Sequence, residues 1–80
     1  MKFFSAFMKS IARDVNDSIA DHNREKAKDT AFKNAGKQIS SAKKSGTYVN
    51  GSQIYKKELQ KQNALIDRKH KRREKFIDDL

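Results

Sequence analysis

The stretch 3-FFSAFMKSIARDVNDSIADH-22 has the clearest structural pattern in the chain. Its large apolar residues recur mostly at intervals of three or four, so at about 100° per residue they share one stripe of a helix. We therefore predict an amphipathic helix over residues 3–22. The stripe consists of Phe4, Phe7, Met8, Ile11, Val15 and Ile19.

This apolar stripe has three interpretations. It can form the hydrophobic core, because a chain with only 35% apolar residues needs its large ones inside. It can also fit a groove on a partner protein, or anchor the helix in a membrane interface. Residues 1–22 have three basic and three acidic groups, so they lack the cationic face of a membrane-surface helix. We expect the stripe to be core, with partner contact second and membrane contact last.

The stripe does not continue beyond Ile19. The next positions on the same face are His22 and Lys26, and the later apolar residues lie on another side of any unbroken helix. A break near residues 21–23 would explain this change, and Asn23 is a suitable N-cap for a new helix. We therefore predict a second helix over residues 24–44, ending before the pair Ser45-Gly46.

Residues 45–52 are predicted to form the main connection, because Asn50-Gly51 is a strong turn pair. A β-hairpin around this pair is the less favoured alternative, since an isolated two-stranded ribbon needs support from packing. A third helix is predicted over residues 53–78. At 1.5 Å per residue it would reach about 40 Å, which is more than a compact domain of this size needs. We expect part of this helix to project or to dimerise.

The composition indicates one small all-α domain over residues 1–80. The chain contains no proline and only three glycines, so little interrupts a helix. It also contains no cysteine, which excludes disulfides and thiolate metal sites. The core of an 80-residue chain is thin. About three packed helices are therefore expected to provide the stability, with help from a partner or from a second copy in a homodimer.

Positive charge is the main functional signal. The net charge is +9, and the densest cationic group lies in the predicted third helix. Lysine and arginine side chains bind phosphate groups, and a helix can present them to a nucleic-acid backbone. We predict nucleic-acid or polyanion binding by Arg68, Lys69, Lys71, Arg72, Arg73 and Lys75, although a solvated helix end has the same composition. An auxiliary basic group consists of Lys33, Lys37, Lys43 and Lys44.

Signs of catalysis or metal binding are missing from the sequence. His22 and His70 each lack a second histidine or a cysteine at ligand spacing, so we expect no metal and no cofactor. We recognise no glycine-rich phosphate loop and no nucleophile motif. We therefore predict that the protein is not an enzyme.

Two functions fit these features. The first is a small basic protein that contacts nucleic acid through phosphates. The alternative is a protein-interaction module, such as a small inhibitor or adaptor of phage or bacterial origin, that docks on an acidic surface of a larger protein. No apolar run reaches the ~20 residues of a membrane span or the ~7–15 of a signal-peptide core. We expect a soluble, cytoplasmic protein with little affinity for membranes.

Overall fold

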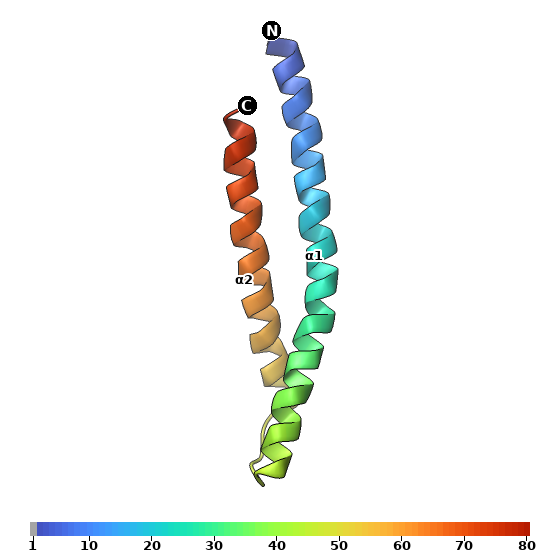
Figure 1. The fold of residues 1–80 in the computed structure, drawn as a ribbon, viewed down its shortest axis with the longest axis vertical. Coiled ribbons are helices and arrows are strands. Elements are labelled where there is room, and N and C mark those ends of the chain that lie inside the picture. The colour runs from blue at the N-terminus through green and yellow to red at the C-terminus, as the bar shows by residue number, and fades with distance from the viewer. Residues whose placement is uncertain (1) are drawn as a thin grey trace.

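The computed structural model describes the backbone of residues 2–80 and the side chains of residues 5–80. This part of the chain is a helical hairpin in which α1 runs over Lys2–Lys44 and α2 over Gly51–Asp78. The two helices lie side by side and antiparallel (Figure 1), in a rod with extents of 66 × 16 × 13 Å. The all-α prediction is confirmed. The prediction of about three helices is wrong, because the described residues form two.

The predicted break at residues 21–23 does not occur, and α1 continues through it to Lys44. No proline is present and the first glycine is Gly36, so the backbone has no reason to stop earlier. Asn23 is half-buried inside the helix and caps nothing. The apolar stripe lies off the face of α1 that packs on α2, and that face continues from Ala20 to Ala27, so the end of the stripe does not mark a helix end.

The face of α1 that packs on α2 consists largely of alanine. Ala20, Ala27, Ala31 and Ala35 are each at most 3% exposed. Across from this alanine face, Ile66 of α2 is buried with Ala20 and Ala27, and Leu59 packs against the same cluster. Small side chains permit a short distance between two helix axes. The hairpin is therefore held by close helix contact, with no large side chain fully enclosed among the described residues.

Four of the buried positions of α1 form two pairs that are eleven residues apart. Asn16 and Ala27 form one such pair, and Ala20 and Ala31 form a second; all four are buried. Eleven residues in three turns give about 3.67 residues per turn, close to the 3.6 of a straight helix. A long α1 can therefore keep one face against α2.

The connection between the helices is set by a cap at each end. Gly46 has φ 73°, and the amide of Thr47 donates to the carbonyl of Ala42 at 2.9 Å, which is the geometry of a Schellman end to α1. Asn50 caps α2, because its Oδ1 accepts from the amide of Gln53 at 3.3 Å. The β-hairpin alternative is wrong, since this segment is a short loop followed directly by α2.

The apolar stripe near the N-terminus lies outside the core of the hairpin. Its members are exposed by 63% at Phe7, 46% at Ile11 and 53% at Val15, with Met8 at 45% and Ile19 at 39%. The side chain of Phe4 lies outside the described residues. The core interpretation of the stripe does not hold within this single chain, because the alanine face occupies the contact with α2.

The element that projects is α1 and not the predicted C-terminal helix. α2 lies against α1, and the first turns of α1 extend beyond the end of α2 (Figure 1). Over the described residues, neither helix contains a segment long and apolar enough to cross a membrane.

We predict that Gly36→Ala stabilises the protein. Gly36 lies within α1, and no heavy atom outside the local helix backbone lies within 4 Å of an added Cβ. Alanine in a helix interior is more stable than glycine by about 0.5–1 kcal/mol. Urea denaturation followed by circular dichroism measures this gain.

The control is Gly46→Ala, which should destabilise the protein because φ at Gly46 is +73°. A loss of stability in Gly36→Ala would contradict the helical path of α1 through this position.

Candidate polyanion-binding surface

A row of cations lies on the face of α2 that points away from α1. The residues of α2 that are buried are Glu58, Ile66 and Ile77. At 100° per residue, Arg68 and Lys75 fall on the opposite side of the helix from Ile66 and Ile77. The row, called the outer stripe below, spans roughly 27 Å at 1.5 Å per residue. It consists of the exposed residues Lys57, Arg68, Lys71, Arg72 and Lys75.

The outer stripe is not neutralised by the acidic groups of the chain. Among the residues with described side chains, none of its five members lies within 4.0 Å of a carboxylate oxygen. Lys61 shares this face but contacts Glu58 at 3.5 Å. Asp78, near the end of α2, contacts Arg13 at 2.9 Å. The stripe therefore keeps its positive charge available to an external partner.

The structure separates Arg73 from the other predicted cations. Arg73 turns toward α1, where its Nε donates to Oδ1 of the buried Asn16. The side-chain Nδ2 of Asn16 donates in turn to the backbone carbonyl of His70 at 3.2 Å. The Nη2 atom of Arg73 is also buried, and it has no hydrogen-bond partner among the described residues. Arg73 is thus part of the contact between the helices.

The remaining predicted cations are exposed but occupy different faces. Lys69 lies at the edge of the helix contact, beside a hollow that it lines together with Asn23 and Lys26. The auxiliary group is exposed along α1 and forms no continuous row with the outer stripe; it consists of Lys33, Lys37, Lys43 and Lys44. Lys57 was missed by the sequence prediction because it lies outside the densest basic run.

Asp17, His70 and Glu74 form the one group of described residues that could offer three metal-ligand atoms, all within 4.8 Å of one another. Sequence spacing did not reveal it, because Asp17 lies on α1 and the other two lie on α2. The Nε2 atom of His70 is 2.8 Å from Oδ1 of Asp17 and 3.5 Å from Oε1 of Glu74. The contact between His70 and Asp17 joins the two helices, whereas that between His70 and Glu74 lies within α2, and we assign the group to helix packing.

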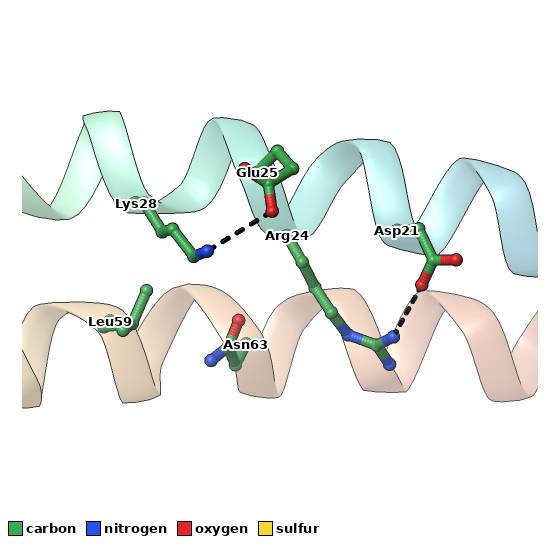
Figure 2. Close-up of a pocket in the computed structure, with 6 residues that line it drawn as sticks. All are labelled: Asp21, Arg24, Glu25, Lys28, Leu59 and Asn63. Atoms are coloured by element: carbon green, nitrogen blue, oxygen red, sulfur yellow. Dashed lines mark hydrogen bonds and ion pairs between the residues drawn. The ribbon is translucent and has the colours of Figure 1, made fainter.

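A shallow hollow lies between the helices near the middle of the rod (Figure 2). Its charged side chains are already paired. Lys28 contacts Glu25 at 3.3 Å, and Arg24 contacts both Asp21 and Asp67 at 3.2 Å. Leu59 and Asn63 of α2 line the opposite side. The hollow is lined by ion pairs of the kind found on any helix surface, and we assign no reaction to it.

Glu58 is an acidic residue buried in the contact between the helices, with 8% exposure. The hydrogen bond from Nε2 of Gln38, at 2.7 Å, is the main reason that the pKa of Glu58 is lowered. Burial opposes this shift, and the positive charge of Lys61 supports it. The carboxylate form of Glu58 therefore stabilises the folded chain.

We predict that this contribution is lost in acid. The pKa of Glu58 is lower in the folded chain than its ordinary value of 4.5, so the stability is present above that value and is lost as the pH falls through the folded pKa. Glu58→Gln should reduce the drop in Tm between about pH 5 and about pH 3. Thermal melts followed by circular dichroism measure the drop.

The matched control is Glu25→Gln, which removes an exposed carboxylate whose one ion pair among the described residues is with Lys28. Equal drops in wild type and Glu58→Gln would contradict the assigned role of Glu58.

The outer stripe is the surface whose chemistry is clearest. A row of exposed ammonium and guanidinium groups along one helix can bind successive phosphates without contacting bases. No protein-family model, curated protein or solved structure matches the chain.

Proposed function

We propose that the protein binds nucleic acid through phosphate contacts from the outer stripe of α2. The supporting observation is that five cations, all exposed, share one face of one helix: Lys57, Arg68, Lys71, Arg72 and Lys75. None of the five is paired with a described carboxylate. When such a row neutralises phosphates, condensed counterions are released from the nucleic acid, and this release favours binding.

The length of the stripe suits a phosphate backbone. A duplex has one negative charge per roughly 1.7 Å of axis, so a row of about 27 Å lies along many more phosphates than it has cations. Arginine adds forked donors that can bind two phosphate oxygens together. Binding of this kind depends on charge and spacing, and we expect little dependence on nucleotide sequence.

The charge of the whole chain supports the same proposal. A net charge of +9 on 80 residues attracts polyanions and speeds their encounter with the stripe. The alternative partner, an acidic protein surface, would be attracted by the same field. The two are distinguished by whether the chain binds nucleic acid directly and whether that binding needs the cations of the outer stripe.

We predict that Arg68→Gln, Arg72→Gln and Lys75→Gln together weaken binding to duplex DNA, single-stranded DNA and RNA. Each phosphate contact contributes about 0.9 to the slope of log affinity against log salt for a duplex, so the slope should fall by about 2.7 if all three side chains contact phosphates. Fluorescence-polarisation titrations at several salt concentrations measure both affinity and slope. Arg73 is left unchanged because it contacts Asn16.

The matched control is Lys33→Gln, Lys37→Gln and Lys43→Gln, which removes the same charge from α1. We expect a smaller loss of affinity from this control. Equal losses would assign the binding to net charge and not to the outer stripe. Absence of binding at about 0.15 M salt would contradict the proposal and favour a protein partner with an acidic surface.

A further inference from the structure

One apolar surface of the hairpin is left uncovered. Five large side chains near the N-terminus, called the N-terminal stripe below, are between 39% and 63% exposed on one side of α1. Single exposed apolar residues are ordinary, but a contiguous group of this kind marks an interaction surface. α2 cannot cover it, because α2 is bound to the alanine face of α1. The stripe consists of Phe7, Met8, Ile11, Val15 and Ile19.

The hairpin exposes more surface than a folded chain of its mass normally does. Its accessible surface is 6605 Å², for a mass of 9.2 kDa. A compact monomer of this mass would expose about 4,900 Å², so the excess is roughly 1,700 Å². A stable interface needs roughly 800 Å² from each partner. This excess follows from the rod shape and is spread along both helices, and a dimer contact along α1 would bury part of it.

The charge near the stripe favours a second copy as the partner. Residues 1–22 contain three basic and three acidic groups, and residues 67–80 of α2, which pack beside them, add a net charge of +2, so +7 of the net charge of +9 lies in residues 23–66. Two copies repel each other least where these weakly charged ends meet. An anionic membrane would instead favour a stripe flanked by lysine and arginine. Asp14, Asp17 and Asp21 are close to this stripe in the sequence and would oppose such contact.

We infer that a second copy of this chain covers the N-terminal stripe, in an antiparallel contact between the two α1 helices centred near Ile11. A symmetric pair uses the same surface on both copies, which a single self-complementary stripe can provide. The antiparallel arrangement places Lys26 and Lys33 of each copy far from those of the other. A parallel arrangement would place them side by side. This inference does not depend on nucleic-acid binding.

Sedimentation equilibrium tests the inference. Wild type should have twice the mass of a 9.2 kDa chain. Ile11→Gln with Val15→Gln should weaken the dimer at least about tenfold, since both side chains would lose apolar contact. The control, Phe32→Gln with Leu65→Gln, changes residues that are 73% and 47% exposed but lie outside the stripe, and it should remain dimeric. Circular dichroism checks that each variant stays helical.

Two further measurements test the dimer without relying on the stripe variant. If the stripe variant unfolds, the Tm of wild type is measured at several protein concentrations instead. The Tm of a dimer rises with protein concentration, whereas that of a monomer does not. Small-angle X-ray scattering reports the arrangement. An antiparallel dimer joined by its N-terminal ends should be much longer than the 66 Å of one hairpin, whereas a parallel dimer should stay close to that length.

Several outcomes would overturn the inference. They are a wild type that stays monomeric up to about 100 μM, a Tm independent of concentration, and a stripe variant as dimeric as wild type. A maximum dimension near 66 Å in the dimer would overturn the antiparallel arrangement. A monomer that co-sediments with phosphatidylglycerol vesicles would reassign the stripe to a lipid surface.

Discussion

The close contact between the alanine face of α1 and α2 is the constraint on which the rest of the molecule depends. Ala20, Ala27 and Ala31 are small enough to bring the helix backbones together. Once α2 occupies this face, the large apolar residues of α1 have to lie elsewhere. The same contact fixes the rotation of α2 about its own axis, and so decides which of its cations face the solvent. The exposure of the N-terminal stripe and that of the outer stripe both follow from the packing of α2 on the alanine face.

Sequence reasoning identified the helical class and most helix ends, but not the path of α1. Lys44, Gly46 and Asn50 mark ends by local chemistry, which can be recognised without tertiary structure. The predicted break is wrong because alanine, and not the large apolar residues of α1, forms the face that packs on α2. Alanine contributes little to an apolar pattern, so the face that packs on α2 was hidden among polar neighbours.

The sequence predicted most of the cations of the candidate surface, but not which cation of the basic run faces α1. Exposure of Arg68, Arg72 and Lys75 follows the helical spacing of the basic run. The inward position of Arg73 depends on Asn16, which is 57 residues away in the sequence. Spacing within α2 alone could not show which side of that helix would meet α1. Long-range partners of this kind are visible only in three dimensions.

The topology of the hairpin also sets the order in which contacts between α1 and α2 form during folding. Gln38 and Glu58, near the loop, are separated by 20 residues, whereas Arg13 and Asp78, at the open end, are separated by 65. Loop-closure entropy rises with separation, so contacts near the loop form at the lowest cost and zippering proceeds toward the termini. The open end closes last and frays first. The part of the rod that contains the N-terminal stripe is therefore also the part with the weakest local cohesion.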